Sequence, residues 1–499
     1  MRILFAATEM EPFASTGGMG DVLGALPPAL SALGAEVSVV MPRYGFIDSE
    51  KLGLKPYGAN ERYATVGGLK KRFRVLSKQH DSVEVLFVDQ PTFFDRDRIY
   101  GTTDSDYPDN AARFVFFSRA VLQLAASMEP RPDVIHFHDW HTSLGPVYMA
   151  CDPETMENLS SVAAVLTIHN LGYQGIFPRP EMLTADLGPE LFNQDAMEFW
   201  GQMNFLKGGI VFSDAVIAVS SKYAEEIQTD EFGFGLEGIV RDHSKKTFGI
   251  INGANYTRWD PATDPSLPAN YDRTNLQGKT KCKSALQKEM KLAENPTVPL
   301  VGMVTRLVEQ KGLDLLVDSI ERLMELDVQF AVLGLGAERY HTRLLEFAER
   351  WPGKFSAVIG FNERLSHLIE GGSDIFLMPS RYEPCGLNQI YSLRYGTIPV
   401  VRTTGGLDDT VIDVDVDPAR GNGFKFDEFD SMAMTNRLTR ALSLFGNDQQ
   451  RWRKIMDNAF AADFSWDVSA HRHLEVYRWA RKHKQSSSNV NSESSAGNG

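Results

Sequence analysis

The 499-residue sequence has few cysteines, no excess of positive charge and no long apolar run, and each absence excludes a class of protein. Cys151, Cys282 and Cys385 lie far apart in the chain, so their spacing predicts neither a disulfide framework nor a thiolate metal site. The formal net charge of -14 argues against a nucleic-acid-binding protein, whose contact surface would be basic. We therefore expect no nucleic-acid partner and a reducing compartment, either the cytoplasm or a plastid stroma.

The apolar segments are short. The N-terminal run 1–8 ends at Glu9, which is too early for a signal-peptide core or a membrane span. No other stretch approaches the roughly 20 apolar residues that a spanning helix needs, so we expect no membrane association. Hydrophobic residues still make up 43% of the chain. Because a single core stops growing at roughly 250–300 residues, the length predicts two domains of similar size.

Short runs rich in Val, Ile and Phe alternate with amphipathic stretches, which predicts βαβ units covering parallel sheets. In the first half the expected strands are 2–7, 37–42, 83–88, 133–138, 162–168 and 215–219, and the expected helices include 21–34, 109–127 and 201–213. In the second half the expected strands are 299–304, 329–333, 356–360, 375–378 and 398–402. No internal repeat is visible, and the sequence carries no signal for an oligomeric state.

The predicted fold class is α/β, with two doubly wound, Rossmann-like domains that face each other across a cleft. Pro, Asn and Asp gather after residue 250 and indicate a connector. The expected segments are a first domain at 1–250, a hinge at 251–265, a second domain at 266–462, a C-terminal helix at 463–484 and a tail at 485–499. The tail is almost free of apolar side chains and is predicted to be disordered.

A glycine-rich segment, 15–21, follows the first strand and opens a helix. Glycines there let the backbone approach a ligand, and a helix start offers free N–H groups to an anion. The spacing does not match the dinucleotide fingerprint Gly-x-Gly-x-x-Gly. A tight turn without a ligand remains open, as does a role for Asp21 as a helix N-cap only.

Three histidines cluster at the end of the strand 133–138, where open α/β sheets bind ligands. His136 and His138 share a strand face, which is compatible with zinc, but buried structural histidines are the simpler interpretation. Asp139 and His141 lie nearer the strand end and are better functional candidates. His169 and Asn170 follow the next strand and place a polar pair in the same region.

The second half carries three loops that could hold a phosphate. Arg306 and Lys311 flank a strand-to-helix loop, where a guanidinium and an ammonium can grip phosphate oxygens, although both could also be surface cations. The segment 380–389 places Glu383 just before a helix N-terminus, and 403–407 forms another glycine-rich strand end. Phosphate held by one set of strand ends and sugar by another is typical of a nucleotide-sugar transferase.

These segments, together with 167–178, 205–208 and 251–253, resemble the bacterial glycogen synthase and plant starch synthase family, and the Glu383-Pro384-Cys385-Gly386-Leu387 run is highly specific. The resemblance covers residues 1 to about 480. It implies a GT-B fold, retaining transfer of glucose from ADP-glucose or UDP-glucose to an α-1,4-glucan such as glycogen, no cofactor and no required metal ion. It also implies a last helix that crosses back to the first domain.

The resemblance implies a role for each matching position. The catalytic residues that it implies are Glu383, Arg306, Lys311, His169 and Asp139. The donor-binding residues are Ser15, Gly17, Gly18, Asn170, Asn252, Phe361, Cys385, Gly386, Leu387, Asn388, Thr404 and Gly405. The acceptor-binding residues are Asp21, Asp139 and His141.

Three positions depart from the family or from related transferases. Ser15 stands where the family usually has a donor-binding lysine, which removes one cation, and Asn388 replaces a common Thr. Tyr391 occupies the second position of the Glu-x7-Glu spacing of many related retaining transferases, as is typical of the synthase branch.

Three other functions stay open at this point. The motif Asp413-Val414-Asp415 resembles an Asp-x-Asp metal site, although a solvated acidic turn is the simpler interpretation. Ser15 also motivates a glucan-binding or priming homologue with reduced catalysis. A glycosidase would need a carboxylate pair across the scissile bond and would have no use for the cationic loops.

Overall fold

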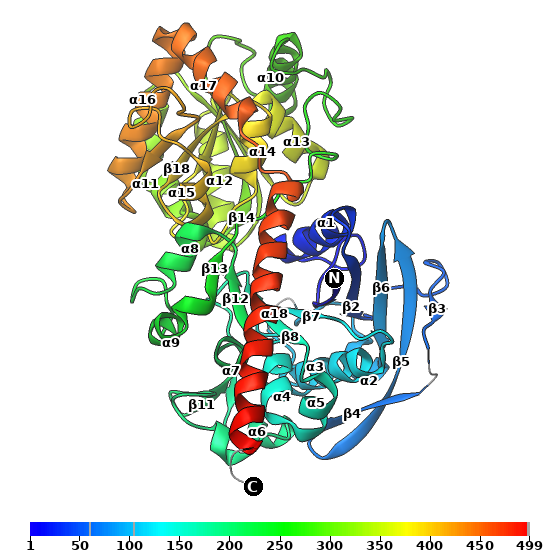
Figure 1. Cartoon of the computed structure of the whole chain (residues 1–499). Coiled ribbons are helices and arrows are strands. Elements are labelled where there is room, and N and C mark those ends of the chain that lie inside the picture. Colours follow the sequence, from blue (N-terminus) through cyan, green and yellow to red (C-terminus); the bar gives the residue numbers. More distant parts are fainter. Residues whose placement is uncertain (59–60, 103–104, 497–499) are drawn as a thin grey trace. The chain divides into compact units, whose positions relative to one another are not determined.

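The computed structural model describes residues 1–58, 61–102 and 105–496 (Figure 1). Contacts divide the chain into two compact units. Unit 1 comprises Met1–Val219, Ala224–Gly253 and Trp466–Gly499, and unit 2 comprises Ser220–Tyr223 and Ala254–Ser465. Within the described residues, no helix is both long and apolar enough to span a bilayer.

Unit 1 is built on a 10-stranded sheet with the order β13-β12-β8-β7-β1-β2-β6-β5-β3, in which β4 pairs with β5. The parallel strands are β1 (Arg2–Ala6), β2 (Glu36–Pro42), β6 (Val83–Asp89), β7 (Val134–His138), β8 (Ala163–Ile168), β12 (Ala215–Ala218) and β13 (Thr247–Gly249). β7 and β8 are buried along their whole length, as apolar runs in a parallel sheet should be.

An antiparallel edge extends this sheet and was not predicted. It consists of β3 (Lys55–Pro56), β4 (Arg62–Val66) and β5 (Leu69–His80). β5 carries several Lys and Arg side chains, so its composition lacks the apolar pattern by which the other strands were predicted. A separate three-stranded sheet contains β10 (Glu198–Phe199), β11 (Gln202–Asn204) and β9 (Ile176–Pro178).

Helices cover the sheet of unit 1. They are α1 (Gly18–Ala32), α2 (Pro91–Phe94), α3 (Asn110–Ser127), α4 (Leu144–Cys151), α5 (Pro153–Leu159), α6 (Glu181–Thr184), η1 (Pro189–Leu191), α7 (Phe205–Phe212), α9 (Glu237–Asp242), η2 (Ser244–Lys246) and α18 (Trp466–Ala496). The long α18, drawn in red in Figure 1, packs on α1 and β8. The hydroxyl of its Tyr477 lies 2.8 Å from Nδ1 of His136, and its Arg481 pairs with Asp133 at 3.0 Å.

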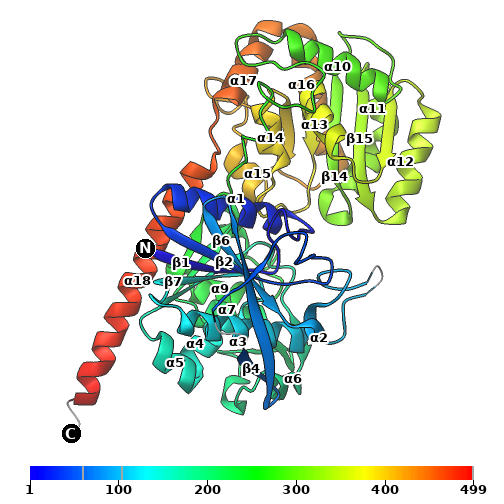
Figure 2. The same ribbon diagram turned by 90° about the vertical axis from the view of Figure 1, so that its right-hand side faces the viewer.

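Unit 2 is a six-stranded parallel sheet with the order β16-β15-β14-β17-β18-β19 (Figure 2). The strands are β14 (Leu300–Leu307), β15 (Gln329–Gly336), β16 (Phe355–Ile359), β17 (Ile375–Met378), β18 (Ile398–Arg402) and β19 (Phe424–Phe426). The helices are α8 (Ser221–Glu226), which begins in this unit, α10 (Gln277–Glu289), η3 (Glu309–Lys311), α11 (Leu313–Met324), α12 (Glu338–Arg350), α13 (Glu363–Gly372), α14 (Asn388–Arg394), α15 (Gly405–Thr410), α16 (Ser431–Asn447) and α17 (Gln449–Ala461).

Every strand that was predicted from an apolar run is present, and its ends lie within three residues of the predicted ones. Two segments differ from expectation. Residues from Ala254 onward belong to unit 2, because Trp259 stacks on His367 at 3.8 Å and the buried Asp264 accepts a hydrogen bond from Tyr395 at 2.5 Å. The predicted hinge therefore shortens to the residues before Ala254. In the predicted tail, α18 continues to Ala496, and residues 497–499 lie outside the described part.

Candidate functional site

Lys311 and Glu383 form a close ion pair at the carboxyl end of the sheet in unit 2. Nζ of Lys311 lies 2.5 Å from Oε2 of Glu383, and Oγ of Ser380 donates to the same oxygen at 3.0 Å. Glu383 is buried, with 6% of its surface exposed. Lys311 is the last residue of the short helix η3, whose C-cap Gly312 has a left-handed φ of +69°. Only glycine fits at position 312, because a Cβ there would lie 1.9 Å from the carbonyl oxygen of Pro379.

The two glycine-rich loops of unit 2 pack against each other. The amide of Gly406 donates to the carbonyl of Glu383 at 3.1 Å, and a Cβ on Gly405 would lie 2.0 Å from that carbonyl oxygen. Asn388 opens α14 and donates from Nδ2 to the carbonyl of Val304 on β14 at 2.7 Å. The predicted donor-binding residues 383–388 and 404–405 therefore form one contiguous cluster.

Two further predicted residues of unit 2, the catalytic candidate Arg306 and the donor-binding candidate Phe361, are open to solvent. Arg306 is exposed near the end of β14, and its guanidinium makes no ion pair with the described part of the chain. Phe361 follows β16 and is 88% exposed, an unusual state for a phenylalanine side chain. Cys385 and Thr404, in contrast, are buried beside Glu383.

In unit 1, a buried carboxylate orders the first glycine-rich loop. Glu9 accepts hydrogen bonds from the amide and the hydroxyl of Thr16 at 2.5 and 2.8 Å, and from the hydroxyl of Tyr100 at 2.6 Å. Gly17 is the N-cap of α1, so Asp21 lies in the first turn rather than at the cap. A Cβ on Gly17 or Gly18 would meet no protein atom within 4 Å. These glycines therefore leave open space in front of a helix N-terminus, next to the exposed Ser15.

Asp139 is held in an unusual state directly after β7. Its φ is +53°, and its Oδ1 accepts a hydrogen bond from the amide of His169 at 2.7 Å. Burial raises the pKa of this carboxyl to about 7, against the lowering effect of the amides of His169 and Asn170. Asp139 can therefore exchange a proton near neutral pH, as general acids and bases do.

The histidines at this sheet edge are neutral. His136 is a structural residue, since its Nε2 bonds to the hydroxyl of Thr167 at 2.7 Å and its Nδ1 to Tyr477. Burial lowers the pKa of His138 well below its ordinary value, and that of His169 to about 3. Among the described residues, no group of three His, Cys, Asp or Glu side chains is placed to hold a metal ion.

The pairing of His138 with His169 assigns their protons. Nδ1 of His138 lies 2.9 Å from Nε2 of His169, while Nε2 of His138 is buried without a partner in the described structure. An orphaned N–H group costs more than an orphaned lone pair, so the proton belongs on Nδ1 of His138. His169 then accepts at Nε2 and carries its own proton on Nδ1, which makes that atom a hydrogen-bond donor.

The remaining predicted residues of unit 1 lie on neighbouring strand ends. His141 is buried against Tyr100 and Trp140, at ring distances of 4.5 and 4.0 Å, and burial lowers its pKa. Asn170 accepts from the amide of Gly172 at 3.0 Å and is half-buried. Asn252, which is 7% exposed, follows β13.

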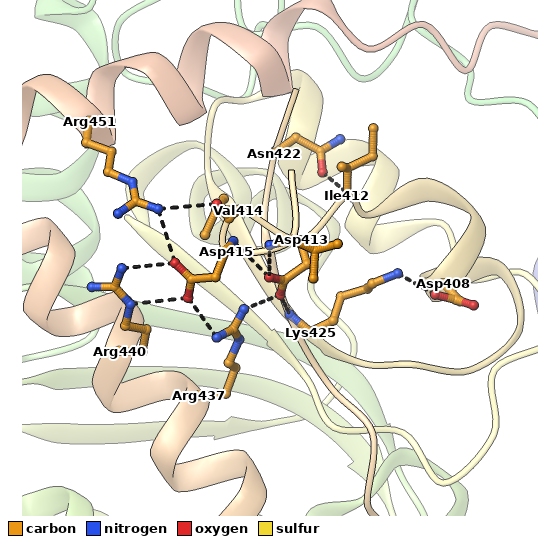
Figure 3. Close-up of polar contacts among 11 residues, drawn as sticks. Asp408, Ile412, Asp413, Val414, Asp415, Asn422, Lys425, Arg437, Arg440 and Arg451 are labelled. Carbon is orange, nitrogen blue, oxygen red and sulfur yellow. Dashed lines mark hydrogen bonds and ion pairs between the residues drawn. The ribbon is translucent and has the colours of Figure 1, made fainter. Parts of the chain in front are cut away.

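The acidic motif after α15 forms a turn at 414–416 in which Asp415 is exposed, as the simpler of its two interpretations expects, and arginine side chains pair with its carboxylates. Asp415 pairs with Arg437 and Arg440 at 2.9 Å and with Arg451 at 3.1 Å (Figure 3). Asp413 is buried, pairs with Arg437 and accepts from the amide of Lys425 at 2.7 Å. Hydrogen bonding to Arg440 is the main reason why the pKa of Asp415 is lowered. The arginines occupy the oxygens that a metal ion would need.

The structure also places three residues in this machinery that the sequence did not single out. Glu9 orders the glycine-rich loop and Ser380 supports Glu383, as described above. Gln389 is fully buried and donates from Nε2 to the carbonyls of Cys385 and Gly386 at 3.0 Å. Glu9 and Ser380 follow strands closely and Gln389 lies in the first turn of α14, so a polar residue near a strand end or a helix start was the only signal for them.

Comparisons with known proteins agree with the motifs. A family model described as starch synthase catalytic domain matches residues 2–242, and one described as glycosyl transferases group 1 matches residues 286–458. The chain is 46% identical to a glycogen synthase of Anaeromyxobacter sp. (strain Fw109-5), covering 96% of this chain and 99% of that protein. It is 42% identical to a glycogen synthase of Thermotoga petrophila, with coverage of 96% and 99%.

Solved structures show the same fold. The catalytic domain of starch synthase IV from Arabidopsis thaliana, bound to ADP and acarbose, matches with a TM-score of 0.87 and 34% identity over 96% of this chain and 99% of that chain. Sucrose-phosphate synthase from Thermosynechococcus elongatus matches with a TM-score of 0.60 and 16% identity, over 96% and 98% of the two chains, which shows the fold alone. The α/β fold class is thus that of GT-B glycosyltransferases, and the chain belongs to the glycogen synthase and starch synthase family.

Proposed function

We propose that this glycogen synthase homologue transfers glucose from ADP-glucose, with retention of configuration, to the 4-hydroxyl at the non-reducing end of an α-1,4-glucan. The observation that carries the proposal is the 2.5 Å pair of Lys311 with the buried Glu383, together with the exposed Arg306 near the end of β14. The ADP bound to the Arabidopsis relative favours the adenine donor. UDP-glucose is the alternative donor.

In this proposal the cations of unit 2 act on the departing diphosphate. Cleavage of the bond between the anomeric carbon and the phosphate oxygen leaves negative charge on that oxygen. Arg306 and Lys311 would stabilise this charge, together with the amides of Gly386, Leu387 and Asn388 near the start of α14. Glu383, Cys385, Thr404 and Gly405 would hold the donor, with Phe361 beside its base.

Residues of unit 1 would act on the sugar and the acceptor. Nδ1–H of His169 would donate to a sugar hydroxyl, and Asn170, Asn252, Gly17 and Gly18 would also contact the donor. Asp139, Asp21 and His141 would contact the incoming glucan. A neutral histidine can hydrogen-bond to the hydroxyl groups of a sugar. A protonated histidine would instead compete with Arg306 and Lys311 for the negatively charged leaving group.

The retained configuration requires a specific order of bonds. We favour attack on the same face as the leaving group, in which the 4-hydroxyl oxygen bonds to the anomeric carbon and its proton passes to the departing phosphate oxygen. A carboxylate nucleophile at the second position of the Glu-x7-Glu spacing is absent, since Tyr391 fills it and stacks on Trp259 at 4.2 Å. No cofactor and no metal ion takes part in these steps.

A donor comparison tests the proposal. Purified protein is given glycogen and either ADP-glucose or UDP-glucose labelled in the sugar, with and without EDTA, and the release of nucleoside diphosphate is followed with the label on the glucan. We expect faster transfer from ADP-glucose, no effect of EDTA, and a product digestible by an α-1,4-specific amylase. A metal requirement or a preference for UDP-glucose would contradict the corresponding part of the proposal.

A glucan-binding or priming homologue with reduced catalysis is the second candidate, because Ser15 replaces a usual lysine. The same assay separates the two functions. A binding protein would retain glycogen yet release no ADP from ADP-glucose, whereas a synthase does both.

A further inference from the structure

The end of strand β15 lies tightly against the end of β14, which carries Arg306. The two strands pair in parallel as far as Leu307 and Gly336. A Cβ on Gly334 would lie 2.3 Å from the carbonyl oxygen of Thr305. A Cβ on Gly336 would lie 2.3 Å from the carbonyl oxygen of Leu307. The glycines of β15 therefore let the two backbones fit closely on both sides of Arg306, so the position of Arg306 depends on the course of β15.

His341 supplies a partner for the last amide of β15. The neighbouring strand β16 ends at Ile359, which pairs with Gly334, so β16 does not reach Gly336. In its place, Nε2 of His341 accepts a hydrogen bond from the amide of Gly336 at 3.0 Å. This bond requires the lone pair on Nε2 and puts the proton on Nδ1, which lies 3.3 Å from Oε2 of Glu338. The imidazole therefore holds the last residue of β15 in place.

The helix that carries His341 is itself fixed to the loop of Lys311. Tyr340 is buried, and its hydroxyl donates to the carboxylate of Asp314, whose two oxygens both lie 3.0 Å away. Asp314 lies in the first turn of α11, three residues after Lys311. Only 14% of the His341 side chain is exposed, so the ring has little freedom to move away from Gly336. The start of α12 is therefore a rigid support for both loops.

We propose that His341 is a positioning residue for the donor: it holds Gly336, and through it the end of β14, so that Arg306 meets the diphosphate in a fixed geometry. The inference rests on the proposed function, in which Arg306 stabilises the leaving group. Supporting hydrogen bonds hold such a group in its productive geometry, and a misplacement of about 1 Å can cost up to about 10²-fold in rate. His341 does not itself touch the donor in this arrangement, so its loss should act only while Arg306 is present.

The variants His341→Leu and His341→Gln separate the hydrogen bond from the bulk of the side chain. Leu cannot accept a hydrogen bond, whereas Oε1 of Gln can accept one from about the position of Nε2 in His. In H341L we expect turnover with ADP-glucose to fall about five- to tenfold and Kd for ADP to rise about fivefold, with KM for glycogen changed by less than about twofold. H341Q should keep all three values within about twofold of the wild type.

A variant that loses a buried hydroxyl elsewhere in unit 2 controls for a general loss of stability. Tyr271→Phe removes a hydroxyl that donates to the carbonyls of Gly371 and Tyr395 at 3.1 and 2.9 Å. It should lower the midpoint of urea unfolding without a change in Kd for ADP. An equal rise of Kd in Y271F and H341L would show that H341L acts through stability and would overturn the proposal.

A double-mutant cycle with Arg306→Ala separates this inference from the proposed function. Calorimetry gives Kd for ADP, without sugar transfer, for the wild type, H341L, R306A and the double variant. In the R306A background, H341L should change Kd by less than about twofold, because no guanidinium is left to position. Additive effects, a Kd in H341L equal to the wild type beside a weakened R306A, or equal losses in H341Q and H341L would overturn the role of His341 alone. Unchanged Kd values in both H341L and R306A would overturn the phosphate role of Arg306 as well.

Discussion

The strand ends of the two units use opposite electrostatics. In unit 1 burial suppresses charge at two of the predicted site residues: it lowers the pKa of His169 to about 3 and raises that of Asp139 to about 7. In unit 2 the corresponding residues are charged, with Arg306 open to solvent and Lys311 paired with Glu383. Uncharged hydrogen-bonding groups suit a sugar and cations suit a diphosphate, so each unit offers a different kind of contact.

The contrast also separates function from stability. Arg306 supports no described ion pair, so its charge is available to a ligand at no cost to the fold. Lys311 and Asp139 lie in desolvated surroundings, where a change of charge alters the free energy of unfolding as well. Substitution of Arg306 should therefore change activity alone, whereas substitution of Lys311 or Asp139 should also change the free energy of unfolding.

Lys311→Ala should have the largest effect. Loss of one cation that stabilises the leaving group is expected to cut turnover by about 10²- to 10³-fold. The same change leaves the buried Glu383 unpaired, which should lower the free energy of unfolding by about 3 kcal/mol. Turnover with ADP-glucose and urea unfolding measure the two losses.

Arg306→Ala is the matched comparison for that prediction. Turnover should fall by a similar factor, while the midpoint of urea unfolding stays at the wild-type value, because Arg306 is exposed and forms no ion pair among the described residues. Near-normal turnover in both variants would contradict the phosphate role, and equal destabilisation would contradict the electrostatic contrast.

Asp139→Asn should change the pH dependence of stability. The folded pKa of about 7 lies above the ordinary 3.8, so between these values the folded state binds more protons and stability falls as the pH rises. The amide side chain of the variant does not titrate, so its stability does not fall with pH for this reason. Its stability relative to the wild type should therefore grow by about 3 kcal/mol between pH 5 and pH 8.

Urea unfolding of both proteins at half-unit steps of pH measures this difference. The neutral buried histidines act in the other direction, since their lowered pKa makes stability fall as the pH drops below about 6.5. Their contribution is common to both proteins and cancels in the comparison. A difference that stays constant with pH would show that Asp139 is not held neutral by burial.

Tyr477→Phe should cost less than either change, about 1–3 kcal/mol. The substitution removes the 2.8 Å hydrogen bond to His136 and leaves its Nδ1 buried without that partner. Arg481→Ala on the same helix is the control. Its pair with Asp133 is partly exposed and should contribute less than about 1 kcal/mol to chemical unfolding. A larger loss of unfolding free energy in Arg481→Ala than in Tyr477→Phe would contradict this ranking of the two contacts.

Ser15→Lys should have the smallest effect. It adds a cation to a loop before α1 whose only charged side chains are the carboxylates of Glu9 and Glu11, at a position where Ser15 is exposed. KM for ADP-glucose should fall by up to about fivefold, equivalent to about 1 kcal/mol. Ser15→Gln, which is polar but uncharged, should leave KM unchanged; an equal fall in both variants would rule out the charge as the cause.

The sequence predicted the parallel strands well because their apolar runs must be buried on both faces. It predicted the antiparallel edge β3–β5 and the small sheet β9–β11 poorly, since these strands are short or rich in charge. For the candidate site, motifs singled out Asp139, His169, Lys311 and Glu383, whose roles stay predictions. Their spacing could not reveal the partner of Glu383, which lies 72 positions away.

The order of the residues alone specified two α/β halves, the glycine-rich loops and the family, because these depend on local periodicity and short motifs. The folded arrangement was needed for the pKa of Asp139, the proton positions of His138 and His169, and the arginine partners of Asp415. Each of these depends on burial or on contacts between distant segments, and neither quantity is encoded in any short stretch of the chain.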